Sequence, residues 1–203
     1  MDSGAFLKIA AAAATVVLLS APAAHAGRDI FRDVFPVPKA FAHLGGEDLQ
    51  LPADRTLIVI GASATEPEEY AAESLQKLVR LRYGHEWRIV RDEKPSAGGA
   101  AVIIGQVSTC RLAAAVAREW TIDPARVPAS HDGYQIRTGR FQGRPVALVL
   151  GSNPRSCIYG QDTLSQLLQN GKSGLALPRV AVRDWSSIKW RGRPHAEIGR
   201  AHV

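Results

Sequence analysis

The sequence predicts an α+β fold, a two-layer sandwich in which a mixed β-sheet carries helices mainly on one face. Short apolar runs alternate with longer amphipathic stretches in the order β-α-β-β-α-β-β-α-β. Neighbouring strands joined by short polar turns favour a mixed sheet over a doubly wound parallel one. The apolar content of 46% is ordinary for a globular protein and argues against disorder.

The first predicted strand and helix lie within residues 57–84. Leu57–Ile60 is a short apolar run, typical of a buried strand. Thr65 or Ser63 is expected to cap the helix that follows. Its first turn holds Pro67 and three glutamates, which suit the positive end of a helix dipole. Gly84 is expected to end this helix.

The remaining helices and strands are predicted from apolar residues at helical spacing and from short apolar runs. Leu112, Val116 and Trp120 recur at helical spacing and predict a second helix. A third helix is predicted from about Arg155 to Gln169, ending at Asn170 and Gly171. Residues 27–52, rich in proline and glycine, are predicted to be extended. Further strands are predicted at 87–90, 101–104, 134–136, 146–150 and 180–182.

The first 26 residues have the features of a secretory signal peptide. Lys8 precedes an apolar stretch over residues 9–19, and residues 24–26 form a small-x-small cleavage site. The apolar stretch is short for a bilayer span, which needs roughly 20 residues. We therefore expect export to the periplasm or the exterior, with no membrane span after signal cleavage; an uncleaved anchor is the alternative.

The last residues match a sequence of non-biological origin. Residues 198–203, Ile-Gly-Arg-Ala-His-Val, are what one reading frame of a common sequencing adapter encodes. This match predicts a non-native tail over residues 197–203. An ordinary basic tail is the alternative.

Charge and cysteine content exclude several classes of function. The net charge of +6 is scattered, with no run of five basic residues, so no nucleic-acid partner is expected. Cys110 and Cys157 could pair after export, although two buried free thiols are the favoured interpretation. The six histidines show no metal-ligand spacing. No metal or other cofactor is expected.

Two glycines stand where a phosphate-binding loop could begin. Gly61 and Gly105 each follow a predicted strand and precede a helix. Neither belongs to a G-x-x-x-x-G-K-[ST] or a G-x-G-x-x-G pattern, and glutamates crowd the first helix start. Both glycines are therefore interpreted as tight-turn residues.

Three acidic pairs are the only obvious candidates for glycosidase chemistry, which uses two carboxylates. Glu68–Glu69 lies in the first turn of a helix, while Glu47–Asp48 and Asp92–Glu93 lie in loops. Each pair is interpreted as solvated or as complementing a helix dipole. The sequence therefore predicts no catalytic residue.

Two further polar groups have competing interpretations. His131–Asp132 with Ser130 suggests a catalytic arrangement, but adjacency in sequence supplies no geometry, and a turn before a strand is favoured. Asn153 and Arg155 precede the third helix and could contact sugar. Helix capping by Asn153 or Ser156 is the favoured alternative.

Several short motifs occur in an order that resembles a known family. They are Pro36 and Pro38 before Gly45–Gly46, Ile103–Ile104–Gly105, Gly133–Tyr134–Gln135–Ile136, Val149–Leu150–Gly151, Tyr159–Gly160 with Thr163–Leu164, Leu177–Pro178, and Asp184 with Arg191–Gly192. Together they resemble the N-terminal accessory domain, domain 2-like, of β-N-acetylhexosaminidase-type glycoside hydrolases of families 20 and 84 and their relatives.

The resemblance implies a domain over residues 27–185 and the start of a catalytic barrel over residues 186–196. In these families the catalytic carboxylates lie on the barrel, so none is carried over to this chain. The chain is expected to be the non-catalytic part of an exported hydrolase that removes terminal N-acetyl-hexosamine. Its expected partners are its own missing catalytic barrel and, through the parent enzyme, a carbohydrate substrate. The rival hypothesis is a stand-alone periplasmic carbohydrate-binding or scaffolding module.

Overall fold

The computed structural model describes residues 34–187. The predicted signal peptide over residues 1–26 and the predicted non-native tail over 197–203 lie outside the described residues. So does all but the start of the predicted barrel segment over 186–196. The domain predicted over 27–185 is described from Val34 onwards.

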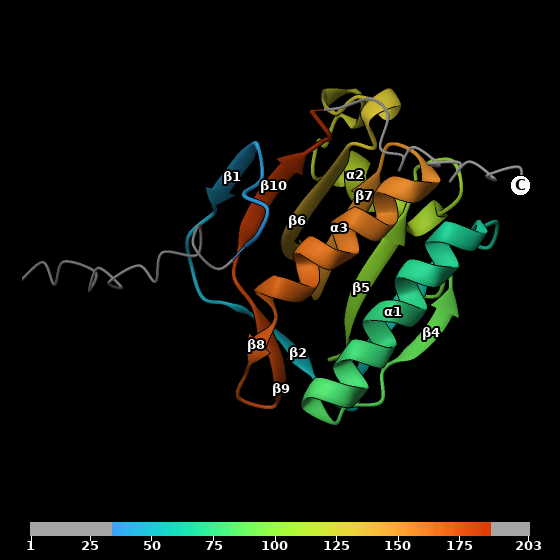
Figure 1. Cartoon of the computed structure of the whole chain (residues 1–203). Coiled ribbons are helices and arrows are strands. Elements are labelled where there is room, and N and C mark those ends of the chain that lie inside the picture. Colours follow the sequence, from blue (N-terminus) through green and yellow to red (C-terminus); the bar gives the residue numbers. More distant parts are fainter. Residues whose placement is uncertain (1–33, 188–203) are drawn as a thin grey trace, which may run out of the picture.

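The described chain holds ten strands, three α-helices and two short 3-10 helices (Figure 1). In chain order they are β1 (Ala40–His43), β2 (Leu49–Pro52), β3 (Thr56–Ile60), α1 (Glu66–Tyr83), β4 (Arg88–Arg91), β5 (Ala100–Gly105), α2 (Arg111–Glu119), η2 (Pro124–Arg126), η3 (Ala129–His131), β6 (Tyr134–Phe141), β7 (Arg144–Gly151), α3 (Pro154–Leu167), β8 (Gln169–Asn170), β9 (Gly174–Leu177) and β10 (Val180–Asp184).

The main sheet is mixed, which confirms the predicted α+β class. Its seven strands lie in the order β1-β10-β6-β7-β5-β3-β4. The four strands from β7 to β4 are parallel, whereas β6, β10 and β1 are joined to them by antiparallel pairing. A second, three-stranded sheet has the order β2-β9-β8.

The helices lie on both faces of the main sheet, two on one and one on the other. Figure 1 shows α1 and α3 side by side across one face. Their apolar sides bury Ile58, Val102 and Val149 in the larger core. On the opposite face α2 covers Val59 and Ile103 in a smaller core. The two-layer description holds for α1 and α3, and α2 adds a partial third layer.

The ends of α1 are set by the signals expected from the sequence. Thr65 is the N-cap residue, and its backbone N–H donates to the Glu68 carboxylate at 2.7 Å. Gly84 follows the last turn in the left-handed region, with φ of 72°. Glycine adopts this conformation without a steric penalty, which explains why the helix ends there.

The end of α3 differs from the prediction. The helix ends at Leu167 and not at Asn170, because Leu168 has extended backbone angles. Gln169 and Asn170 form β8 and pair with β9. Strand pairing in the small sheet therefore replaces the last helical turn that the apolar periodicity suggested.

The extended N-terminal segment contributes a strand to each sheet. β1 pairs with β10 at the edge of the main sheet, and β2 pairs with β9 in the small sheet. The first and last described strands therefore lie side by side. Both ends of the described chain lie on this side of the fold (Figure 1).

Candidate functional site

The two candidate loops after β3 and β5 are tightly packed. A Cβ atom at Gly61 would overlap the backbone of Thr109, and one at Gly105 would lie 3.0 Å from the Cβ atom of Cys110. The two strand ends therefore press directly against the start of α2. This packing agrees with the tight-turn interpretation of both glycines.

Glu68, which was interpreted as solvated or as complementing the helix dipole, is buried and therefore not solvated. Its side chain lies in the first turn of α1 and has no solvent exposure. The Thr65 hydroxyl donates to one carboxylate oxygen at 2.7 Å. The other oxygen accepts from the backbone N–H of Gln106 at 3.1 Å and from the Thr109 hydroxyl. Glu68 therefore fastens α1 to the loop between β5 and α2.

Asp92 plays a similar part at the end of β4. Its carboxylate accepts from the backbone N–H of Ala62 at 2.9 Å and of Leu112 at 3.2 Å. Burial alone would raise the pKa of Asp92. The hydrogen bonds from Ala62, Leu112 and Cys110, together with the charge of Arg111, outweigh burial and hold the pKa below its usual value.

The two cysteines are unpaired and buried, as the favoured interpretation predicted. The thiol of Cys110 caps α2 by accepting from the Ala113 backbone N–H at 3.3 Å. Burial raises the pKa of Cys110 to about 12 and raises that of Cys157 as well. Both thiols are therefore protonated at neutral pH and poor nucleophiles.

Two of the remaining acidic residues of the three pairs make structural contacts, and Glu47 is exposed. Glu69 pairs with Arg91, and Asp48 accepts from the side-chain amide of Gln169 at 2.7 Å. Glu93 is exposed.

Ser130, His131 and Asp132 do not assemble a nucleophile with a base and an acid. The Ser130 hydroxyl lies 3.0 Å from Nδ1 of His131. The Asp132 carboxylate instead accepts from the side-chain amide of Asn153 at 2.8 Å. Asn153 also caps α3 by accepting from the Ser156 backbone N–H, as the capping interpretation predicted. These residues form the turn before β6.

One sizeable pocket opens where the two ends of the described chain meet. Its volume is 440 Å³, within the range of small-ligand sites. It lies between the residues before β1, the start of β6, one side of α3 and the end of β10. Its walls are Phe35, Pro36, Asp132, Tyr134, Tyr159, Asp162, Thr163, Ser165, Gln166, Asp184, Trp185 and Ser186.

Hydrogen bonds fix the floor and one rim of this pocket. The Tyr134 hydroxyl lies 2.6 Å from Oγ1 of Thr163 and donates to Asp184 at 3.4 Å. Burial raises the pKa of Tyr134, so the phenol stays protonated. At the rim, the Gln166 amide accepts from the Phe35 backbone N–H and donates to the Phe35 carbonyl oxygen.

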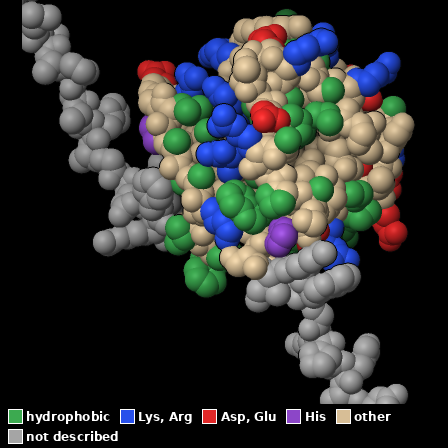
Figure 2. All heavy atoms as spheres, turned by 90° about the horizontal axis from the view of Figure 1, so that it is seen from above, with side chains coloured by type: hydrophobic (Ala, Val, Ile, Leu, Met, Phe, Trp, Pro, Cys, Tyr) green, Lys and Arg blue, Asp and Glu red, His purple; other side chains and the backbone are tan. Residues whose placement is uncertain are grey.

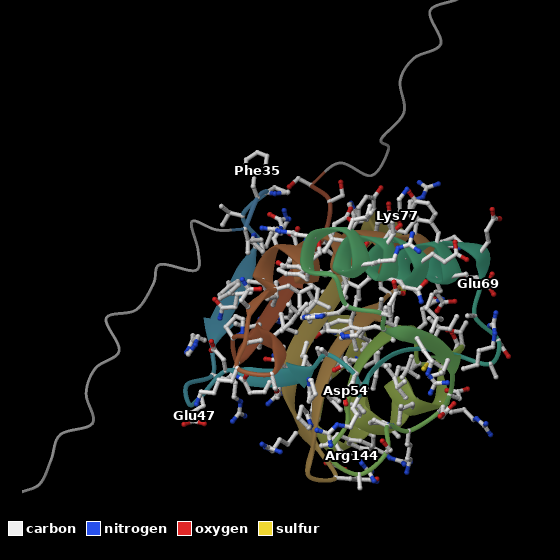
Figure 3. All side chains as sticks on the ribbon, turned by 90° about the horizontal axis from the view of Figure 1, so that it is seen from below. Phe35, Glu47, Asp54, Glu69, Lys77 and Arg144 are labelled. Carbon is white, nitrogen blue, oxygen red and sulfur yellow. The ribbon has the colours of Figure 1, made fainter. Side chains whose placement is uncertain are left out.

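Phe35, Pro36 and Asp162 are the exposed residues among those that line the pocket. Phe35 is 83% exposed, and its side chain projects from the surface in Figure 3. The Asp162 carboxylate has no hydrogen bond or ion pair with any residue in 34–187, and partial burial raises its pKa. The rim therefore presents an apolar ring and an unpaired carboxylate to a ligand that enters the pocket.

The pocket differs in charge from the protein as a whole. Three aspartates line it, and no lysine, arginine or histidine does. The chain carries a net charge of +6, and Figure 2 shows Lys and Arg side chains in a broken band across the face seen from above. The pocket is thus an acidic depression in a basic protein.

No signal in the sequence marks this pocket as a unit. Its walls come from four segments, near residues 35, 133, 162 and 185, which only the folded chain brings together. Asp184 and Tyr159 occur in the family-like motifs, but neither was a candidate site residue. Within the described range, no three acidic, histidine or cysteine side chains are grouped as a metal site would require.

No helix within residues 34–187 is both long and apolar enough to cross a bilayer.

Comparison with known families gives one match, which spans the described fold. The family described as glycosyl hydrolase family 20, domain 2, matches residues 32–185. This range runs from just before the first described residue to the residue after β10. No curated protein matches the chain.

Solved structures share the fold at low sequence identity. CpGH84D superposes with a TM-score of 0.58 at 16% identity, covering 78% of this chain and 24% of that protein. The GH20 exo-β-N-acetylglucosaminidase from Vibrio harveyi, solved in complex with N-acetylglucosamine, superposes with a TM-score of 0.51 at 11% identity. That match covers 75% of this chain and 19% of the Vibrio protein. The chain thus spans about a quarter or less of the length of these proteins.

Proposed function

The chain belongs to the family of glycosyl hydrolase family 20 domain 2, and from this premise we propose that it is the non-catalytic accessory domain of an exported glycoside hydrolase. The observation that carries the proposal is the family match, which takes in every strand and helix from β1 to β10. The acidic residues described above support the non-catalytic part, because Glu68, Asp92 and Glu69 are engaged in joining loops and helices.

The parent enzyme is proposed to remove terminal N-acetyl-hexosamine from glycans. The Vibrio harveyi protein with a similar fold is an exo-β-N-acetylglucosaminidase, and this chain matches about a fifth of its length. The remaining length of such a protein has room for a catalytic barrel. The carbohydrate would therefore meet the parent enzyme and not this domain alone.

The catalytic barrel is the proposed partner of this domain. Large apolar side chains stand exposed on the outer side of α1, namely Tyr70 and Leu81. Phe35 stands exposed at the pocket rim. Interfaces are marked by contiguous apolar patches and not by single exposed side chains, so the proposal of this partner rests on the family match. Export is proposed from residues 1–26, whose pattern is that of a signal peptide.

Enzyme assays on two proteins test the proposal. The purified 203-residue chain should release no aryl alcohol from an aryl N-acetyl-β-glucosaminide. The same chain extended by the region encoded downstream in intact genomic DNA should hydrolyse it. Steady turnover by the 203-residue chain would refute the non-catalytic role. A downstream region without a barrel would refute the parent enzyme.

A stand-alone carbohydrate-binding module is the second candidate function. The pocket favours it, because aromatic walls with carboxylate and amide acceptors suit a hydroxylated ligand. Titration with N-acetylglucosamine oligomers would distinguish the two functions. Saturable binding by the 203-residue chain, together with a genuine stop codon after it, would favour the module.

A further inference from the structure

The pocket beside α3 has the size and the walls of a site for one small molecule. Its volume of 440 Å³ lies within the range of about 300 to 1,000 Å³ that ligand pockets occupy. Four aromatic side chains line it, namely Phe35, Tyr134, Tyr159 and Trp185. The polar groups around this space indicate the charge of the ligand that fits it.

Several hydrogen-bond donors at this pocket are already used within the protein. The Tyr134 hydroxyl donates to Asp184, so the Thr163 hydroxyl, 2.6 Å away, is the donor in the bond between the two hydroxyls. The Ser165 hydroxyl donates to a carbonyl oxygen of its own helix at 2.8 Å. The amide nitrogen of Gln166 donates to two backbone carbonyl oxygens, at 3.1 and 3.3 Å. These four side chains therefore keep no donor for a ligand.

The acceptors at this pocket are in excess. The Asp162 carboxylate accepts no hydrogen bond and forms no ion pair within residues 34–187. In the same range, the Asp184 carboxylate accepts only the Lys39 backbone N–H at 3.3 Å and the Tyr134 hydroxyl at 3.4 Å, both of which are long bonds. A carboxylate offers about four lone-pair sites. Both carboxylates therefore have acceptor sites left over.

The charges of these two carboxylates meet at the pocket floor. Burial raises the pKa of the Tyr134 phenol, and the negative charges of Asp184 and Asp162 raise it further. No lysine, arginine or histidine lines the pocket to offset these charges. An opposite charge close to a carboxylate stabilises its ionised form. The pocket therefore favours a positively charged ligand over a neutral one.

One aromatic wall already carries a cation. The Lys39 ammonium lies 5.5 Å from the centroid of the Trp185 ring, within the cation–π range of about 6 Å. Lys39 does not line the pocket, and its ammonium donates to the Ser187 hydroxyl at 2.7 Å. Within residues 34–187 the exposed Phe35 ring has no such cation. An ammonium group has three donors and no acceptor, so it matches both this ring and the spare carboxylate oxygens.

We propose that this pocket binds a small organic cation through a primary ammonium group, which donates to Asp162 and faces the ring of Phe35. Two kinds of ligand share this chemistry, a hexosamine whose amine carries no acetyl group and an aliphatic diamine. The site goes beyond the accessory role proposed above and requires no catalytic barrel. For a stand-alone module, it specifies a cationic ligand in place of a neutral sugar.

Amide NMR titrations of the 203-residue chain test the site. At about pH 6, where a primary amine is protonated, glucosamine should shift the backbone signals of Thr163, Ser165 and Gln166 saturably and leave those of β4 in place. N-Acetylglucosamine has the same ring without the charge, so it should bind more weakly by roughly tenfold or more. Putrescine distinguishes the two kinds of ligand. If it binds as tightly as glucosamine, the amine alone is recognised, and if it binds more weakly, the amino sugar is the ligand.

A pair of variants tests the role of the carboxylate. Asp162→Asn should weaken glucosamine binding by roughly tenfold, because it removes a hydrogen bond between charged groups. The fold should persist, since this carboxylate holds no structural contact within residues 34–187. Asp54→Asn is the matched control and should leave binding unchanged. Asp54 is exposed in the turn between β2 and β3 and lies apart from Phe35 in Figure 3.

Three outcomes would overturn the site. They are equal effects of the two variants, equal binding of glucosamine and N-acetylglucosamine, and unchanged pocket signals with tens of millimolar of either amine. None of them would affect the proposed accessory role, because that role is tested by hydrolysis of an aryl N-acetyl-β-glucosaminide.

Discussion

Single buried carboxylates join the loops at the carboxyl ends of the parallel strands. Glu68 connects α1 to the loop after β5, and Asp92 connects the end of β4 to the loop after β3 and to the start of α2. A buried carboxylate is stable only when its oxygens are hydrogen-bonded, and each of these accepts several donors. Two acidic residues therefore fix the relative positions of three loops and two helices.

Replacing Glu68 by glutamine should destabilise the fold. The amide cannot accept from all the donors that converge on the carboxylate, and its own N–H groups would face them. We expect the free energy of unfolding in urea to fall by about 2 kcal/mol. Glu69→Gln in the same turn is the matched control, because its ion pair with Arg91 is partly exposed and should matter by less than about 1 kcal/mol. Equal effects of the two substitutions would contradict the role of Glu68.

The stabilising effect of Asp92 should depend on pH. Its pKa in the folded protein is below the usual 3.8, so its contribution is complete above about pH 4 and is lost as pH falls through the lower folded-state value. Asp92→Asn should therefore be less stable than the original chain at pH 7, and this difference should narrow in acid. Urea unfolding of both proteins at pH 7 and at several pH values below 4 measures this difference in the free energy of unfolding. A constant difference across that range would refute the assignment.

At the scale of whole elements, close approach of α3 to the sheet depends on one glycine. Gly160 is buried in the helix, and a Cβ atom there would lie 2.5 Å from Cγ1 of Val149 and 3.2 Å from the Tyr134 ring. Helix propensity alone favours alanine over glycine by about 1 kcal/mol. The packing therefore opposes the propensity at this position.

Gly160→Ala should lower stability despite its better helix propensity. The overlap with β7 must be relieved by shifting the helix or the strand, at a typical cost of about 1 to 3 kcal/mol. Thermal or urea unfolding shows whether the substitution lowers or raises the free energy of unfolding. Adding Val149→Ala removes the overlapping methyl groups, so the double variant should lose less than the sum of the two single losses. A strictly additive pair, or a stabilised single variant, would show that the helix does not press on β7.

The helix ends and the buried strands could be predicted, because the residues that specify them are close together in the sequence. The cap at Thr65, the stop at Gly84 and the cap at Asn153 are set by residues within one helical turn. The sequence predicts the stop, and it offers Ser63 as the alternative to Thr65 and Ser156 as the alternative to Asn153. Strands β3, β5 and β7 are continuous apolar runs because they are buried on both faces.

Features that depend on distant contacts and have no apolar run of their own were not predicted. β8 holds two residues, Gln169 and Asn170, whose strand conformation depends on pairing with β9. Glu68 stands among three glutamates that suggest a solvated turn, and its burial comes from Gln106 and Thr109, some 40 residues later. The pocket is the extreme case, because the residues that line it run from Phe35 to Ser186 in the sequence.

At the scale of the whole molecule, two hydrophobic cores share one sheet. α1 and α3 enclose the larger core and α2 the smaller one, on opposite faces of β3, β5 and β7. Successive side chains of a strand point to opposite faces, so each shared strand supplies both cores. Loss of one core exposes a face of the strands on which the other depends. The described domain should therefore unfold as one cooperative unit.

Substitution in the smaller core tests this coupling. Circular dichroism at 222 nm reports mainly on α1 and α3, which hold 18 and 14 residues against 9 in α2. Val116→Ala leaves a small cavity under α2 and should cost about 2 kcal/mol. If the two cores are coupled, the urea midpoint of the whole dichroism signal should fall, with a single transition. Glu119→Ala, at an exposed position of α2, is the control and should leave the midpoint nearly unchanged. The contrary outcome is an early transition of small amplitude, followed by a main transition whose midpoint is unchanged. It would mean that α2 unfolds independently, because the smaller core would then contribute nothing to the stability of the larger core.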